Sequence, residues 1–278
     1  MPLDRRLVRI SVGLALQSAI PRGIELKALL DLYLNPNLEE ASQLHSRLMA
    51  SRRHGDREVG FWLEPVLEPR PTMPDHGRLA AEMRKMEFLL YELINRAGEA
   101  RQDINDWMDY ISNAIESLTD GFWIDAKILL SQALEISQSE SVERAKSDPS
   151  LRYEIDVLQR ATAEYFQEVR AYPLKLAIPE ERLETLLKVQ EILLDLMQIQ
   201  IRKEPAQKEM LAIAIRRLNT AVRYLMNKDK TTEAARQEVR LAFEYLKGSE
   251  SKVSDEGSRR VVHQLGERMK ELIGTHVP

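Results

Sequence analysis

The sequence has no cysteine, little glycine or proline, and no long apolar run. Without cysteine, disulfide bonds, cysteine-ligated zinc and thiol catalysis are excluded. Only 11 glycines and 12 prolines interrupt 278 residues, which is below average usage and favours helices in a chain rich in Leu, Ala, Glu, Lys, Arg and Gln. No segment approaches the roughly 18 consecutive apolar residues of a membrane-spanning helix, so we expect no membrane partner.

Charge is abundant but unevenly distributed. Charged residues make up 30% of the chain, and the net formal charge is −4. Residues 99–169 contain six Lys or Arg against fifteen Asp or Glu, a net charge of −9, whereas residues 202–230 contain eight against three, a net charge of +5. An acidic and a basic region of this kind bear on the choice of partner rather than on the fold.

The N-terminal stretch MPLDRRLVRISVGLALQSAI joins arginines to a short apolar run, as a signal peptide does. Ser11, Gln17 and Ser18 interrupt the run, and its apolar residues repeat at helical spacing. We therefore expect a helix here rather than a signal peptide, and a cytoplasmic protein.

The most regular pattern lies between residues 79 and 118, where apolar residues alternate at spacings of four and three without a slip. The positions are Leu79, Met83, Met86, Leu90, Leu93, Ala97, Ala100, Ile104, Trp107, Ile111, Ala114 and Leu118. This is the seam of a coiled coil or of a long bundle helix. Further apolar residues, among them Phe88 and Leu89, widen the stripe, which favours a bundle. Gly98 is the one residue in this stretch that disfavours a continuous helix.

The remaining apolar patterns are helical too, and no segment has the pattern of a pair of strands. The sequence therefore predicts an all-α fold, a helical bundle built on one long helix of about 40 residues together with antiparallel helical hairpins. Four prolines between residues 65 and 74 indicate a break in regular structure. We predict a small helical N-terminal unit over residues 1–64, a proline-rich linker over 65–76, and an elongated helical bundle over 77–278.

Two near-copies, GFWLEP at residues 60–65 and GFWIDA at residues 121–126, hold two of the three tryptophans. Their flanking sequences do not match, so we interpret them as two turn-to-helix joints rather than a duplicated site. Aromatic residues are enriched at binding hot spots. The alternative is therefore an exposed partner anchor, and Phe61 and Trp62 beside the linker are its best candidates.

No catalytic, metal or cofactor motif is present. The five histidines lie outside H-E-x-x-H and E-x-x-H arrangements, and the chain has no G-x-S-x-G, phosphate-loop or G-x-G-x-x-G motif. Glu99, Asp103 and Asp106 share a helix face and could bind a divalent cation, but a solvated row of carboxylates is the simpler interpretation. We expect no catalytic residues, no metal and no cofactor.

A basic stretch offers an alternative function. Lys208, Arg216, Arg217 and Arg223 lie in residues 202–230, and Arg216 and Arg223 are spaced to share a helix face. Such residues contact phosphates in nucleic-acid-binding proteins. Only Tyr224 is available nearby for base stacking, however, so we rank a nucleic-acid-associated regulator below a protein-binding function.

The start of the long seam is the part least certain to find a partner within the chain. We predict that Leu79, Met83, Met86, Leu90 and Leu93 bind another protein or a second copy of this chain, with the N-terminal helices as the alternative cover. Methionine at two of these positions suits an adaptable surface. The expected function is a non-catalytic protein–protein interaction, scaffold or adaptor role.

Overall fold

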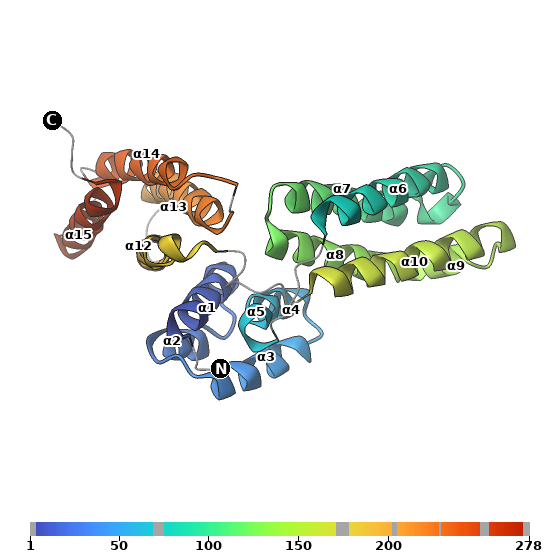
Figure 1. Cartoon of the computed structure of the whole chain (residues 1–278), viewed down its shortest axis with the longest axis horizontal. Coiled ribbons are helices and arrows are strands. Elements are labelled where there is room, and N and C mark those ends of the chain that lie inside the picture. The colour runs from blue at the N-terminus through green and yellow to red at the C-terminus, as the bar shows by residue number, and fades with distance from the viewer. Residues whose placement is uncertain are drawn as a thin grey trace. The chain divides into compact units, whose positions relative to one another are not determined.

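The computed structural model describes residues 4–68, 75–170, 178–201, 205–227, 229–250 and 256–274, although not the side chains of residues 201, 205–208, 250 and 258. Every regular element within these ranges is a helix (Figure 1), which confirms the all-α class. In the same ranges, no helix combines the length and apolar character needed to cross a bilayer. The chain forms two compact units, Met1–Glu68 with Pro173–Pro278 (unit 1) and Pro69–Tyr172 (unit 2).

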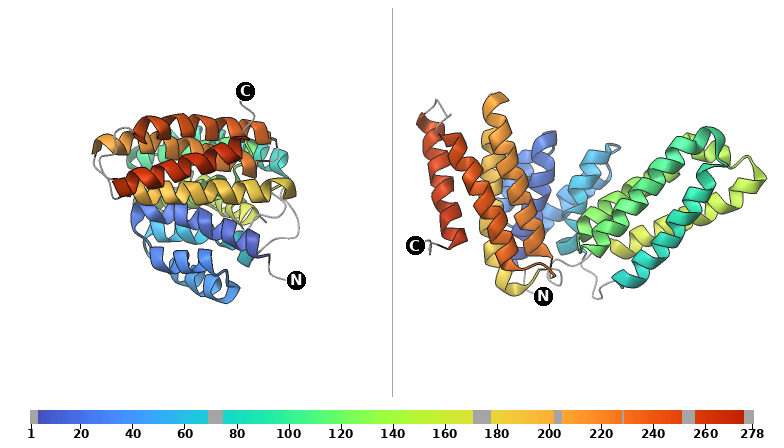
Figure 2. Two further views of the ribbon diagram at one scale, coloured as in Figure 1. Left: turned by 90° about the vertical axis from the view of Figure 1, so that its left-hand side faces the viewer. Right: turned by 90° about the horizontal axis from the view of Figure 1, so that it is seen from above.

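Unit 1 joins the two ends of the chain. Its first helices are α1 (Arg5–Ala19), η1 (Ile20–Arg22), α2 (Leu26–Leu34), α3 (Leu38–Met49), α4 (His54–Phe61) and α5 (Glu64–Leu67). Its later helices are η3 (Glu180–Arg182), α12 (Leu183–Ile201), α13 (Pro205–Met226), α14 (Thr232–Glu250) and α15 (Glu256–Ile273). Helices α12, α13, α14 and α15 pack against one another (Figure 2), and α12 also packs against α1.

The contact between α1 and α12 holds unit 1 together across most of the sequence. Gln190 of α12 is fully buried, and its Nε2 donates a hydrogen bond to the Ile10 carbonyl oxygen at 3.1 Å. At the edge of the contact, Arg9 Nη2 lies 2.7 Å from Glu191 Oε1. Arg6 forms a similar, more exposed ion pair with Glu180 at 2.8 Å.

Unit 2 is a four-helix bundle. It contains α6 (His76–Ile94), η2 (Gly98–Ala100), α7 (Arg101–Thr119), α8 (Trp123–Ser137), the short α9 (Glu140–Ala145) and α10 (Pro149–Val169). Helix α6 packs on α7, α7 on α8, α8 on α10, and α10 on α6, so the four long helices close around one core (Figure 1). The arrangement fits the apolar stripe on each helix, because every stripe can face the shared core.

The predicted single helix over residues 79–118 is wrong in detail, because the structure has two helices there, α6 and α7. The chain turns at Gly98, whose φ of 54° is a left-handed value that glycine adopts without strain. Short contacts between backbone groups, such as Ala100 N–H to the Ala97 carbonyl oxygen at 3.0 Å, close the turn. The two helices form an antiparallel hairpin rather than a coiled coil.

The predicted division of the chain differs from the observed packing in where the C-terminal third belongs. Helices α12 to α15 belong with the N-terminal helices to unit 1, because α12 packs on α1, whereas we predicted one bundle over residues 77–278. Of the predicted linker at 65–76, residues 65–67 belong to the short helix α5 and residue 76 starts α6. Residues 69–74 lie outside the described ranges.

Gly13 of α1 allows the close approach of α12. A methyl group added at Gly13 would lie only 2.3 Å from Gln190 Cδ. We expect Gly13→Ala to destabilise unit 1 by about 1–3 kcal/mol, because displacing Gln190 breaks a buried hydrogen bond and overpacks the contact. This loss exceeds the roughly 1 kcal/mol that alanine gains over glycine in a helix. Amide hydrogen exchange of α1 and α12 measures the effect.

Gly266 of α15 is the matched control. A methyl group there would meet Phe243 Cε2 at 3.4 Å, an ordinary contact. Gly266→Ala should therefore stabilise unit 1 by about 0.5–1 kcal/mol through helix propensity alone. If both variants change the stability of unit 1 in the same direction, the interpretation that Gly13 is closely packed against α12 is contradicted.

Candidate functional site, the outward face of helix α6

Helix α6 is held firmly in unit 2 at both ends. The Asp75 side chain caps its start by accepting a hydrogen bond from Arg78 N–H at 3.1 Å. Arg78 also forms an ion pair with Glu168 of α10. At the other end, Arg96 Nη1 lies 2.9 Å from Glu154 Oε2 of α10. These contacts set α6 antiparallel to α10 and fix which of its faces points away from the bundle.

The seam residues that we predicted to bind a partner face inward. Leu79, Met83, Met86, Leu90 and Leu93 are each at most 2% exposed. The prediction of an exposed docking surface at these five positions is therefore wrong. Helix α6 turns back into α7 at Gly98, and α8 and α10 complete the bundle, so the chain itself covers the seam.

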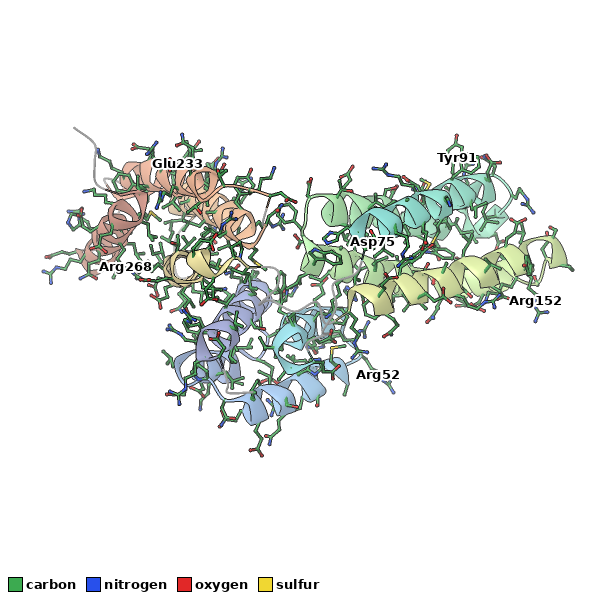
Figure 3. All side chains as sticks on the ribbon, in the orientation of Figure 1. Arg52, Asp75, Tyr91, Arg152, Glu233 and Arg268 are labelled. Carbon is green, nitrogen blue, oxygen red and sulfur yellow. The ribbon has the colours of Figure 1, made fainter. Side chains whose placement is uncertain are left out.

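A different set of apolar side chains on α6 faces solvent. Phe88 is 63% exposed, Leu89 is 51% exposed and Tyr91 is 58% exposed. Phe88 follows the buried Met86 by two residues, about 200° around the helix axis, so it points away from the core. Figure 3 shows the Tyr91 side chain projecting outward from the bundle. We had counted Phe88 and Leu89 as part of the inward stripe; the structure corrects this.

Three charged side chains flank this apolar face. Arg84 and Lys85 precede Phe88 by one helical turn, and Glu92 follows it by one turn; all three are exposed. Within the described residues, none of the three has an ion-pair partner within 4.0 Å, in contrast to Arg78 and Arg96. We name the outward surface formed by Arg84, Lys85, Phe88, Leu89, Tyr91 and Glu92 the α6 face.

The two GFW segments occupy different positions in the fold. Phe61 ends α4 and is 2% exposed, and Trp62 is partly buried and accepts a hydrogen bond from Ser11 Oγ through its carbonyl oxygen. Phe122 and Trp123 instead begin α8, where the Trp123 ring lies edge-on to the His76 ring at 4.1 Å. Both copies thus lie at turn-to-helix joints, because in the first the turn at Trp62 leads into α5. Phe61 is too buried to be the exposed anchor that we considered.

The predicted basic residues lie on α13. Arg216 and Arg223 are exposed, whereas Arg217 Nη1 lies 3.2 Å from Glu238 Oε2 of α14, which offsets part of its charge. Lys230 packs over the Tyr224 ring at 5.7 Å from its centroid. The side chain of Lys208 lies outside the described set.

A charged network in unit 1 joins α1, α2, α12 and α15. Arg268 Nη1 lies 2.7 Å from Asp195 Oδ2, and its Nη2 lies 3.3 Å from Glu191 Oε2 (Figure 3 labels Arg268). Arg9 pairs with Glu191 and stacks 4.8 Å from the centroid of the Tyr33 ring. Burial and then the Glu191 charge raise the pKa of Tyr33 to about 12, so its phenol remains protonated near neutral pH. The network links four helices of unit 1.

Two of the three acidic residues that we considered as a cation site, Asp103 and Asp106, accept hydrogen bonds from neighbouring side chains. Asp103 Oδ2 accepts hydrogen bonds from Ser139 Oγ at 2.6 Å and from Ser141 Oγ at 2.5 Å. These two bonds lower the pKa of Asp103. Asp106 accepts a hydrogen bond from Gln102 at 2.7 Å. Across the described part of the chain, no group of three or more His, Asp or Glu side chains is arranged to hold a metal ion.

Comparison with family models, curated proteins and solved structures finds no match to this chain. The case for a functional site therefore rests on geometry. Among the described residues, Phe88, Leu89 and Tyr91 are the tightest sequence cluster of exposed large apolar side chains. A helical-wheel projection from Met86 would have revealed Phe88, because the inward seam leaves it on the opposite side. We overlooked Tyr91 because it fits no inward position.

Proposed function

We propose that the chain is a non-catalytic helical protein that binds another protein molecule through the α6 face, in a scaffold or adaptor role. The observation that carries this proposal is the exposure of Phe88, Leu89 and Tyr91 within four consecutive residues. Tyrosine and arginine are enriched at binding hot spots, and the α6 face has both.

The energetics favour covering this face. Fully burying a side chain such as Phe or Leu is worth about 1.5–3 kcal/mol relative to leaving it in water. Three such side chains together on a helix that is otherwise well packed are a candidate anchor for a partner helix, which contacts its target through residues spaced three and four apart. The buried seam residues of α6 hold the helix in place before a partner arrives, so little ordering is needed on binding.

Photocrosslinking in the cells that naturally make the protein tests this proposal. The photoreactive phenylalanine analogue p-benzoylphenylalanine is introduced at Phe88 in one version of the chain and at Tyr153 in another. Tyr153 is 75% exposed on α10 of the same unit and serves as the control. We expect a covalent protein adduct from position 88 that is at least tenfold stronger than any from position 153, seen as a band of higher mass on a denaturing gel.

A second change separates specific docking from random encounter. Adding Tyr91→Asp to the chain labelled at position 88 should abolish the adduct, because a carboxylate replaces an aromatic ring of the α6 face. Equal adducts from positions 88 and 153, or an adduct indifferent to Tyr91→Asp, would contradict a binding role for this face.

The alternative of nucleic-acid binding through α13 has weaker support. Arg216 and Arg223 present exposed guanidinium groups, but Arg217 is paired with Glu238 and Lys230 already lies over Tyr224. Contacts to phosphate depend on several cations acting together. We therefore retain protein binding as the proposed function.

A further inference from the structure

The α6 face has side chains at matching distances before and after Phe88, with basic residues before it and an acidic and an aromatic residue after it. Arg84 lies four residues before Phe88, and Glu92 lies four residues after it. Lys85 lies three residues before, and Tyr91 three residues after. All of these side chains are exposed. If two copies of α6 pack antiparallel with the two Phe88 rings facing each other, residues before Phe88 on one copy lie level with residues after it on the other. At about 100° per residue, Lys85 and Glu92 lie on one flank of Phe88, and Arg84 and Tyr91 lie on the other. A twofold axis brings the same flank of both copies together.

The charges complement each other in that antiparallel arrangement. Lys85 of one copy would face Glu92 of the other, and this pairing occurs twice across the twofold axis. Arg84 would face the ring of Tyr91 in a cation–aromatic contact. In a parallel arrangement, by contrast, opposite flanks meet, so Arg84 would face Lys85 of the other copy, and like charges repel.

We propose that the partner of the α6 face is a second copy of this chain, bound antiparallel along α6 in a twofold-symmetric dimer. This rests on the proposed function, because it names the occupant of the same face. An isologous interface uses the same patch on both copies, so that when residue i of one copy contacts residue j of the other, j also contacts i. The patch must therefore be complementary to itself. The outer residues Ala81, Arg84, Phe88, Tyr91 and Asn95 also repeat at spacings of three and four, as helix-to-helix packing needs.

The size of the face sets the expected strength. Stable specific interfaces bury about 800 Å² on each partner, and a face of about three helical turns supplies less than that. We therefore expect reversible dimerisation with a Kd on the order of micromolar. The dimer should form as concentration rises and separate on dilution, which sedimentation equilibrium can follow.

Charge exchange between the two copies is the decisive test. Lys85→Glu places two carboxylates opposite each other, and Glu92→Lys places two ammonium groups opposite each other, so each single variant should weaken dimerisation at least tenfold. An equimolar mixture of the two single variants should dimerise at least tenfold better than either alone, because one of the two symmetric pairings has its charges reversed and the other retains the original Lys85 and Glu92. The double variant Lys85→Glu/Glu92→Lys should also regain dimerisation.

Disulfide trapping tests the direction of packing, and the cysteine-free sequence gives a clean background. Ala81 and Asn95 are both exposed and lie seven residues on either side of Phe88. Under mild oxidation, a mixture of Ala81→Cys and Asn95→Cys chains should give a mixed disulfide dimer. Each variant alone should not, because equivalent positions would lie roughly 21 Å apart. A disulfide from Ala81→Cys alone would indicate parallel packing and overturn the inference.

The failure of this inference is distinguishable from failure of the proposed function. If the photoadduct from position 88 contains a different protein, and sedimentation shows a monomer at every concentration, the second-copy assignment falls while binding through the α6 face stands. A dimer that resists both Lys85→Glu and Glu92→Lys forms through another surface, which also overturns the assignment. If position 88 gives no specific adduct and the chain stays monomeric, both proposals fail.

Discussion

Leu90→Asp is expected to unfold unit 2, whereas Leu89→Asp, one residue away, is expected to leave the unit folded. Leu90 is fully buried, and Leu89 is 51% exposed. At position 90 the change removes a core leucine, worth about 1.5–3 kcal/mol, and adds the larger penalty of a carboxylate without a partner in an apolar core. The combined loss exceeds about 4 kcal/mol, a large part of the 5–15 kcal/mol by which domains are stable.

Amide hydrogen exchange read by mass spectrometry measures this difference locally, which a two-unit protein requires. Exchange in α6, α7, α8 and α10 should become fast in Leu90→Asp and stay slow in Leu89→Asp. Leu89→Asp should nevertheless lose binding through the α6 face, because it places a charge beside Phe88. Equal loss of protection in both variants would mean that α6 presents a different face to the core.

The helical class could be predicted from the sequence, because it depends on local patterns. The break between α6 and α7 could not be predicted from periodicity. Ala97 and Ala100 continue the inward spacing across the turn, so one long helix and a hairpin place the same residues in a core. Gly98 was the only local signal. Its helix penalty of about 1 kcal/mol is small beside the burial gained when α7 folds back.

The inward seam of α6 was correctly identified as apolar, but its role was not. Whether Leu79 to Leu93 face a partner or the chain's own helices depends on whether α7, α8 and α10 return to cover them, and that is decided by tertiary packing. The α6 face was overlooked for the related reason that Phe88 and Leu89 widen the apolar stripe in sequence. Phe88 and Leu89 can be told apart from the buried residues of α6 only once it is known which way those buried residues point.

Which segments of the chain form unit 1 could not be predicted, because the contacts between them join residues that are far apart in the sequence. The bond between Gln190 and the Ile10 carbonyl oxygen spans 180 residues. Helix α12 is buried on more than one side, as its consecutive buried residues Ile192, Leu193 and Leu194 indicate. Such a pattern shows that a helix is enclosed without showing which helices enclose it.

Trp107→Ala is expected to destabilise unit 2 by about 3–5 kcal/mol, the usual range for removing a buried aromatic side chain. Trp107 of α7 is fully buried, and its Nε1 donates a hydrogen bond to Thr162 Oγ1 of α10 at 3.2 Å. Trp107→Phe keeps a ring in place and loses this bond, so the loss should be about 1–2 kcal/mol. Hydrogen exchange in α7 and α10 measures both.

The Thr162 hydroxyl explains why the bond to Trp107 should be measurable by itself. Thr162 is fully buried, and its Oγ1 lies 2.9 Å from the Leu158 carbonyl oxygen, to which it donates its one proton. It therefore meets the indole N–H as an acceptor. Thr162→Val preserves the shape but leaves that N–H buried without a partner, which costs about 1–3 kcal/mol.

A double-mutant cycle isolates this bond from the packing around it. Trp107→Phe and Thr162→Val each break the same hydrogen bond, so combining them should destabilise unit 2 by about 1 kcal/mol less than the sum of the single effects. The double variant leaves neither a buried indole N–H nor a hydroxyl oxygen waiting for one. If the two effects instead add fully, Trp107 stabilises the bundle through the volume of its ring alone, and the bond to Thr162 contributes nothing to the stability of unit 2.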